Sequence, residues 1–221
     1  MRLPYKTLEK KLFNSGYQYV IGVDEVGMGC LAGPVVVCAV AMTNHFYNKH
    51  HRELRWLRES KLLLPHQREK FAAELLKEKD LVYAISSVSP KTIDKINIYQ
   101  ASRIAMRRAV QKLKLMFTRG TFAGAKVPLV VLVDGKTKIK GVDYEQQAII
   151  KGDRKIFAIA CASIIAKVHR DKMMARYDKK YPHYGFAKHK GYGTKYHQAQ
   201  LAALGPCEIH RKSFAPVGKL L

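Results

Sequence analysis

The sequence is poor in acidic residues. Its 221 residues include only 17 Asp and Glu against 40 Lys and Arg, so the formal net charge is +23. An excess this large on a folded chain makes a polyanion the expected partner, with nucleic acid favoured over an acidic membrane surface. The charge does not indicate which nucleic acid is bound, or whether a reaction follows.

Long apolar stretches are also missing. The longest, residues 30–42, contains Gly33 and Pro34 and is too short to span a bilayer. The first residues, MRLPYKTLEKKLF, carry charge where a signal peptide would need an apolar segment. The sequence therefore predicts a cytoplasmic protein that has no membrane partner.

Cysteine is scarce as well, and no two cysteines have the spacing of zinc ligands. The four are Cys30, Cys38, Cys161 and Cys207. Most of them lie among small or apolar residues, as in GMGCLAG and VVVCAVA. We expect reduced cysteines packed in a core, as in cytosolic proteins.

What remains is enough apolar sequence, 48% of the residues, for a folded α/β domain. Segments rich in β-branched and aromatic residues predict strands. They cover residues 17–25, 34–42, 81–90, 128–135 and 145–153. Amphipathic or apolar segments predict helices. They cover residues 5–16, 65–79, 91–116, 156–182 and 197–204.

These elements predict a single domain, residues 1–221, with a central mixed β-sheet flanked by helices. Residues 34–42 are nearly all apolar and should be covered on both faces. Residues 156–168 are apolar all round and should lie deep in the core. Residues 45–64 read as a basic, less regular stretch. Residues 182–221 read as a small, basic, helical C-terminal part.

The few acids gather at predicted strand ends. Asp24 and Glu25 end one strand, Asp134 ends a second, and Asp153 ends a third, short one. Ligand sites in α/β sheets form at the carboxyl ends of strands, so these four side chains are expected to meet. Taken singly, each has a structural explanation, such as a turn residue at Asp134 or a helix cap at Asp153.

Four carboxylates in one place would repel one another unless hard cations lay between them. The cations that prefer oxygen ligands are Mg²⁺, Mn²⁺ and Ca²⁺. A basic surface around an acidic, metal-binding centre is the combination that two-metal cleavage of phosphodiesters requires. The joint pattern therefore favours a metal-dependent site.

Several longer stretches occur in an order typical of one family. They are GVDEVGMGCLAGPVVVCAV, ESKLL, INIYQASRIAM, VLVDG, KGDRKIFAIACASIIAKVHRD and HKGYGT. From about residue 19 to Phe214, the chain closely resembles type 2 ribonuclease H, ribonuclease HII. The resemblance implies a ribonuclease-H-like fold and a two-metal endoribonuclease that uses Mg²⁺ or Mn²⁺. Such an enzyme hydrolyses the RNA strand of RNA/DNA hybrids and cuts 5′ of single ribonucleotides in duplex DNA, leaving 3′-hydroxyl and 5′-phosphate ends.

The resemblance also implies site residues. By motif match, the catalytic, metal-binding carboxylates are Asp24, Glu25, Asp134 and Asp153, the same four that the strand ends select. The substrate-binding residues by motif match are Gly27, Met28, Gly29, Ser60, Lys61, Asn97 and Tyr192. Of these, Asn97, like Gln100 in the same motif, is expected to contact the nucleic acid less directly.

In this family the loop after the Asp-Glu pair is Gly-Arg-Gly, and its backbone lies against the 2′-hydroxyl of the ribonucleotide. Here Met28 replaces the arginine, and a thioether cannot donate to phosphate as a guanidinium can. Tyr192 would stack on the sugar of the deoxynucleotide that follows. Ser60 and Lys61 would contact backbone phosphate.

Other motif positions carry weaker expectations. Lys167, Arg170 and Asp171 share one motif, in which Asp171 is expected to be structural. In the C-terminal part, Lys190, Lys195, Arg211 and Lys212 predict a surface that grips a nucleic-acid strand. Most histidines are expected on the surface, and His189 is a weaker candidate for a phosphate contact.

Alternatives of other classes remain at this point. One is a non-catalytic, basic nucleic-acid-binding protein of the same fold, although a binding module has no need of four acids at strand ends. Another is a resolvase-like nuclease of the same fold. The related type 3 enzymes are disfavoured, because the segment before Asp24 is short. The expected partners are RNA/DNA hybrids and ribonucleotide-containing duplex DNA, bound by a monomer.

Overall fold

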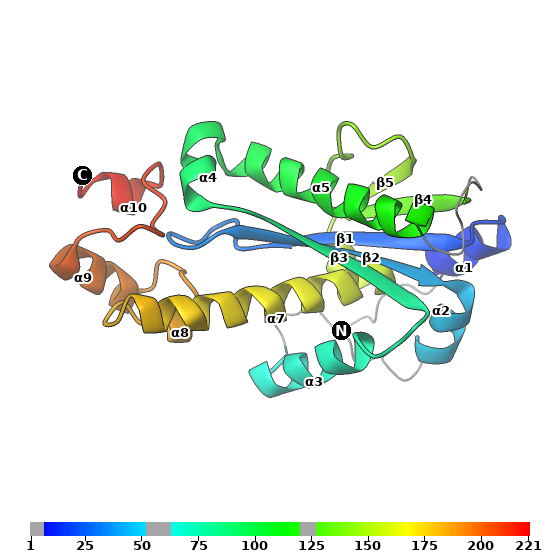
Figure 1. The fold of residues 1–221 in the computed structure, drawn as a ribbon, viewed down its shortest axis with the longest axis horizontal. Coiled ribbons are helices and arrows are strands. Elements are labelled where there is room, and N and C mark those ends of the chain that lie inside the picture. Colours follow the sequence, from blue (N-terminus) through cyan, green and yellow to red (C-terminus); the bar gives the residue numbers. More distant parts are fainter. Residues whose placement is uncertain (1–6, 52–62, 120–126) are drawn as a thin grey trace.

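A five-stranded mixed sheet forms the centre of the molecule in the computed structural model, which describes residues 7–51, 63–119 and 127–221 (Figure 1). Its order is β3-β2-β1-β4-β5, with β1 antiparallel to β2 but parallel to β4. The strands are β1 Tyr19–Val26, β2 Val35–Thr43, β3 Leu81–Val88, β4 Leu129–Asp134 and β5 Glu145–Ile149. The predicted mixed sheet is confirmed.

Helices cover both faces of this sheet, with α5 on one side and α7 on the other (Figure 1). The helices of the first half are α1 Thr7–Asn14, α2 Asn44–His50, α3 Pro65–Leu75, α4 Pro90–Ile96 and α5 Ile98–Arg119. Those of the second half are α6 Gly152–Lys155, α7 Phe157–Lys180, α8 Phe186–His189, α9 Lys195–Leu204 and α10 Ala215–Gly218.

The two helix layers are supported by strands whose successive side chains point to opposite faces. In β1, Val20 packs in the core on the α7 side, and its neighbour Ile21 packs in the core on the α5 side. In β2, Val40 and Ala41 divide in the same way, and both are fully buried. The prediction that residues 34–42 are covered on both faces is therefore confirmed.

Helix α7 packs so closely against β1 that the contact leaves no room for a side chain at Gly22. A Cβ added at Gly22 would lie 2.1 Å from the carbonyl carbon of Ala158, so only glycine allows this contact. The first half of α7 is buried, as its apolar sequence predicts. The close approach also brings Ser163 of α7 to the carboxylate of Asp24 at the end of β1.

Two local predictions from the sequence are wrong. The stretch that reads as irregular begins with a helix, α2, whose first turn is capped by the Thr43 hydroxyl. The predicted single helix over 91–116 is broken at Asn97, which has a left-handed φ of 63°. Asparagine tolerates this conformation, and its side chain then accepts from Gln100 N–H and caps α5.

The described cysteines are all free, as expected, and three of the four are buried. No helix within the described ranges is long and apolar enough to cross a membrane.

Glu9 of α1 is a fully buried acid that joins α1 to the start of α7. One of its oxygens accepts hydrogen bonds from the N–H groups of Phe157 and Ala158. The other oxygen has no partner among the described residues. Burial raises the pKa of Glu9 to about 7, although these backbone hydrogen bonds oppose the rise.

This pKa makes the stability of the protein pH-dependent. Because the folded-state pKa lies above the unfolded value, the protonated carboxyl stabilises the fold at low pH, and that stability is lost as pH rises through about 7. Glu9→Gln removes the titration. Relative to wild type, the variant should therefore gain roughly 2–3 kcal/mol of unfolding free energy between pH 5 and pH 8. Urea denaturation of both proteins at pH 5 and pH 8 measures this difference. If the unfolding free energy changed by the same amount between the two pH values in both proteins, the prediction would be contradicted.

Candidate active site

The predicted carboxylates surround one pocket of about 550 Å³ at the carboxyl end of β1. Val23 of β1 pairs with Val133 of the parallel strand β4, so Asp24 and Asp134 follow at neighbouring positions. Glu25 lies next to Asp24 at the rim. The pocket is lined by Asp24, Glu25, Val26, Gly27, Met28, Gly29, Arg68, Asp134, Asp153, Ser163, Lys167 and Tyr192.

Asp153 reaches the pocket by a different route from the one predicted. Strand β5 ends at Ile149, and Asp153 lies in the short helix α6. The chain turns through Lys151, which has a left-handed φ of 56°, and the N–H of Gly152 donates to Asp134 Oδ1 at 2.6 Å. This hydrogen bond fixes α6 against the end of β4, and so places Asp153 beside the pocket.

Asp24 is the most deeply buried of the four pocket carboxylates, with 5% of its surface exposed. Burial raises its pKa well above the usual range, and the nearby charges of Glu25 and Asp134 raise it further. A hydrogen bond from Ser163 opposes these effects. The chain thus holds negative charge here at an energetic disadvantage that a bound cation would relieve.

The donor set suits a hard divalent cation, because all four acids offer oxygen ligands. As the described side chains stand, however, no three His, Cys, Asp or Glu groups are arranged to hold an ion. Oδ1 of Asp24 accepts from the N–H of Glu25, and Oδ1 of Asp134 accepts from Gly152. These two hydrogen bonds orient the carboxylates and leave each with further lone pairs that a cation could use.

Two basic residues, Arg68 and Lys167, also line the pocket. Lys167 Nζ lies 2.8 Å from Asp171 Oδ1, and Arg68 Nη2 lies 3.8 Å from the second oxygen of Asp171. Lys167 also lies over the ring of Tyr192, 5.9 Å from its centroid. Asp171 thus pairs with two basic side chains that line the pocket, and this contact agrees with the structural role expected for it.

The Gly27–Met28–Gly29 loop forms the rim of the pocket next to the acids. Gly27 has a φ of 93°, and a Cβ there would lie 2.4 Å from Arg170 Nε, so a side chain is excluded. At Gly29 a Cβ would meet nothing within 4 Å, which leaves open space beside the loop. Met28 is partly buried and packs against the core on the α5 side.

Known proteins are similar to this chain over most of its length. The family model described as Ribonuclease HII matches residues 21–217. The chain belongs to the ribonuclease HII family. A Ribonuclease HII from Caldicellulosiruptor bescii is 47% identical over 95% of this chain and 93% of that protein. One from Acholeplasma laidlawii is 44% identical over 100% and 99%, respectively.

A solved structure agrees with the fold. Ribonuclease H2 from Pyrococcus horikoshii OT3 superposes with a TM-score of 0.70 and 27% identity, covering 91% of this chain and 96% of that one. The family and the ribonuclease-H-like fold are therefore confirmed, and the protein is an enzyme of the ribonuclease H class.

Some residues predicted from the ribonuclease HII motifs are not brought to the pocket. Asn97 does not line it, and the structure shows this side chain as the cap of α5. Ser60 and Lys61 lie outside the described residues. Their proposed contacts with nucleic acid stay predictions.

Two pocket residues, Arg68 and Ser163, were missed by the sequence reasoning. Ser163 had a signal, since it is a polar residue within the apolar run that forms the buried half of α7. Arg68 had none, because it sits in an ordinary charged helix, α3.

One prediction for the C-terminal part is wrong. Arg211 is fully buried, so its guanidinium cannot grip a strand. It donates to the carbonyls of Gly27, Met28 and Gly33 at 2.6, 2.9 and 3.0 Å. Arg170 of α7 is equally buried and donates to three other carbonyls, those of Ala32, Pro34 and Lys190.

Buried histidines support Tyr192. His197 Nδ1 donates to the carbonyl of Tyr192 at 2.9 Å, and its Nε2 lies 3.0 Å from Nε2 of His210. Burial lowers the pKa of both histidines to about 4, so both are neutral at pH 7. His210 Nε2 must then donate to His197, and His210 Nδ1 accepts from the N–H of Cys207. Both ring nitrogens of His189 are likewise engaged by backbone groups rather than by solvent.

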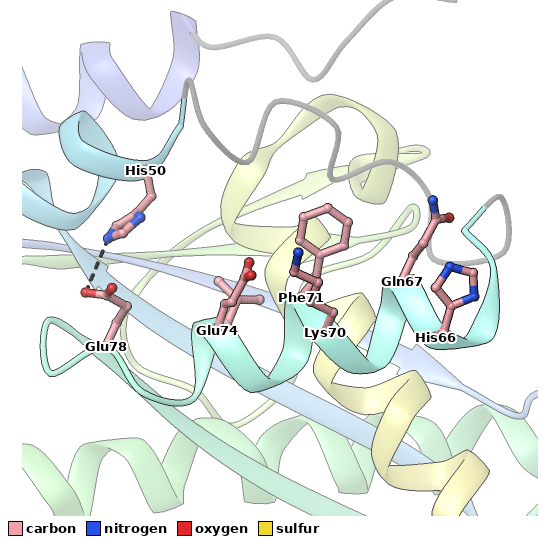
Figure 2. Close-up of a pocket in the computed structure, with 8 residues that line it drawn as sticks. His50, His66, Gln67, Lys70, Phe71, Glu74 and Glu78 are labelled. Atoms are coloured by element: carbon pink, nitrogen blue, oxygen red, sulfur yellow. Dashed lines mark ion pairs between the residues drawn. The ribbon is translucent and has the colours of Figure 1, made fainter.

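A second hollow, of about 590 Å³, lies along α3, and none of its lining residues is shared with the carboxylate pocket (Figure 2). Figure 2 shows Glu78 facing His50, and the two side chains lie 3.2 Å apart. Lys49 lies 3.4 Å from the same carboxylate, so Glu78 is already paired. Size alone therefore does not distinguish the two hollows, but the pocket at Asp24 is lined by four acids and by two basic residues, Arg68 and Lys167.

Proposed function

We propose that this enzyme cleaves the RNA strand of RNA/DNA hybrids and cuts on the 5′ side of single ribonucleotides within duplex DNA. The observation that carries the proposal is one shared pocket. It combines the four carboxylates with the Gly27–Met28–Gly29 loop and Tyr192, the elements that would read the ribose and the sugar that follows it. Only the 2′-hydroxyl distinguishes RNA from DNA at such a point.

Asp24, Glu25, Asp134 and Asp153 would hold two divalent ions, Mg²⁺ or Mn²⁺. Bound there, such ions would activate the attacking water and stabilise the charge on the phosphate and on the leaving oxygen. Water attacks phosphorus, the bond to the 3′ oxygen breaks, and the products carry a 3′-hydroxyl and a 5′-phosphate. Lys167 and Arg68 would attract the phosphate, and Tyr192 would position the sugar next to it.

The C-terminal segment, residues 182–221, would hold the strand beside this pocket. Lys188, Lys195 and Lys212 are exposed on it, and Tyr192 has 37% of its surface exposed. Phosphate contacts of this kind release counterions, so binding should weaken steeply as salt is raised.

The proposal is tested by mapping the cleavage site on a labelled DNA duplex that contains one ribonucleotide. Mg²⁺ and Mn²⁺ are supplied in turn, with an all-DNA duplex and a branched DNA lacking ribose as controls. A single cut 5′ of the ribonucleotide supports the proposal. Tight binding without cleavage at any protein level, or cleavage of the branched DNA, would overturn it.

Met28→Arg should tighten binding to the one-ribonucleotide duplex. An arginine at the rim of the pocket could donate charge-assisted hydrogen bonds to phosphate, which methionine cannot. We expect KM to fall roughly tenfold, or about 1.4 kcal/mol, with the cleavage site unchanged. Met28→Leu, which keeps the apolar packing without charge, is the matched control. An unchanged KM together with an unchanged preference for this duplex would contradict the prediction.

A further inference from the structure

The loop that borders the active site has a buried anchor that the catalytic residues do not explain. Arg211 is fully buried, and it bonds no carboxylate in the hydrogen bonds of the described residues. All three of its donor groups bind backbone carbonyls, and its guanidinium packs on the ring of Phe214 at 5.1 Å. Burial lowers its pKa to about 10, so it remains charged at neutral pH.

Two of these carbonyls belong to Gly27 and Met28, at 2.6 and 2.9 Å. A trans peptide is planar, so its N–H points away from its C=O. With both carbonyls turned to Arg211, the N–H groups of Met28 and Gly29 must point to the opposite side of the loop. Arg211 does not line the pocket, whereas Gly27, Met28 and Gly29 do.

These two N–H groups are available to a ligand. In the described part of the chain, neither is a donor in any hydrogen bond of the loop. Nothing lies within 4 Å of a Cβ built at Gly29, so the space in front of the loop is open. A hydroxyl oxygen placed there could accept from the exposed backbone donors.

The position of Arg211 is itself fixed from two sides. Its own N–H donates to the carbonyl of Leu31 at 2.8 Å, which aligns it with the chain just after the loop. On the other side, Asp94 of α4 accepts from the N–H groups of Lys212 and Ser213 and from the Ser213 hydroxyl. The anchor is thus held by contacts far apart in sequence.

We propose that Arg211 is a positioning residue for ribonucleotide recognition: it holds the carbonyls of Gly27 and Met28 away from the substrate and so presents two N–H groups to the ribose 2′-hydroxyl. This inference rests on the function proposed above. It assigns Arg211 to discrimination between ribose and deoxyribose rather than to general binding of nucleic acid.

The test compares affinities for a one-ribonucleotide duplex and for the same duplex made entirely of DNA. Asp134→Asn serves as the background, so that no substrate is consumed. Arg211→Lys keeps the charge but loses the planar fork that reaches several carbonyls. We expect the ratio of the two affinities to fall by about five- to tenfold, as for the loss of one hydrogen bond. Affinity for the all-DNA duplex should stay unchanged.

Glu9→Ala controls for lost stability, because α1 lies at the opposite end of the molecule from α9 and α10 (Figure 1). It should lower the unfolding free energy without changing the ratio. Asp94→Ala leaves Arg211 in place but frees its segment, and it should lower the ratio by a smaller factor even if Arg211→Lys does not fold. The role of Arg211 would be overturned if the ratio of the two affinities were unchanged in both Arg211→Lys and Asp94→Ala. If Arg211→Lys does not fold, an unchanged ratio in Asp94→Ala alone would overturn it. If the Asp134→Asn protein with Arg211 intact showed no preference for the ribonucleotide, the proposed function would be overturned as well.

Discussion

Asp134→Asn should lower the rate of cleavage roughly 1,000-fold, the effect of losing several kcal/mol of transition-state stabilisation. The substitution removes one of the four charges that would hold the divalent ions. The fold should survive, because an asparagine oxygen can still accept the hydrogen bond that Asp134 Oδ1 receives from Gly152. Binding of the one-ribonucleotide duplex should therefore be largely retained.

Single-turnover cleavage and equilibrium binding on the same duplex measure these two effects separately. Asp143→Asn is the matched control, since Asp143 is exposed and lies outside the pocket. It should cleave at the wild-type rate. If Asp134→Asn retained cleavage within about tenfold of wild type, the assignment of the metal-binding carboxylates would be wrong.

Gly22→Ala should have the largest effect on stability. Its new methyl group would lie 2.1 Å from the carbonyl carbon and 2.3 Å from the carbonyl oxygen of Ala158. These are backbone atoms within α7, so no side-chain rotation can relieve the clash. We expect a loss of roughly 4 kcal/mol or more of unfolding free energy, enough to unfold a marginally stable domain.

Soluble yield and urea denaturation provide the measurement. Gly29→Ala is the control, because its Cβ would meet nothing within 4 Å, and its unfolding free energy should change by less than about 0.5 kcal/mol. A Gly22→Ala protein as stable as wild type would show that α7 can move away from β1. In that case the contact between Ser163 and Asp24 should also be lost, with a matching loss of cleavage.

Much of the fold follows from local pattern. The β-branched and aromatic β1, the nearly all-apolar β2 and the apolar first half of α7 are each visible in the sequence and each confirmed. The helix break at Asn97 was missed because the apolar period continues across it. The pairing of Asn97 with Gln100, a polar cap followed three residues later by a glutamine, was the available signal.

The residues of the candidate site likewise fall into those that the sequence indicates and those that it does not. The four acids could be chosen from the sequence because acidic residues are scarce, and because the carboxyl ends of strands in an α/β sheet form ligand sites. Asp153 lines the pocket as expected, but a short helix rather than a strand carries it there. The place of Arg68 at the pocket and the burial of Arg211 could not be predicted, because forty Lys and Arg look alike in the sequence.

The sequence by itself determined the family, the layers of the fold and which four carboxylates line the pocket, because these depend on residue type and local period. Only the tertiary structure decided which basic residues serve the surface and which serve the interior. A buried guanidinium needs several acceptors, and Arg211 finds them in Gly27, Met28 and Gly33, which are remote in sequence. Such partners are set by packing, so the orientation of the Gly27–Met28–Gly29 loop is a property of the fold rather than of its motif.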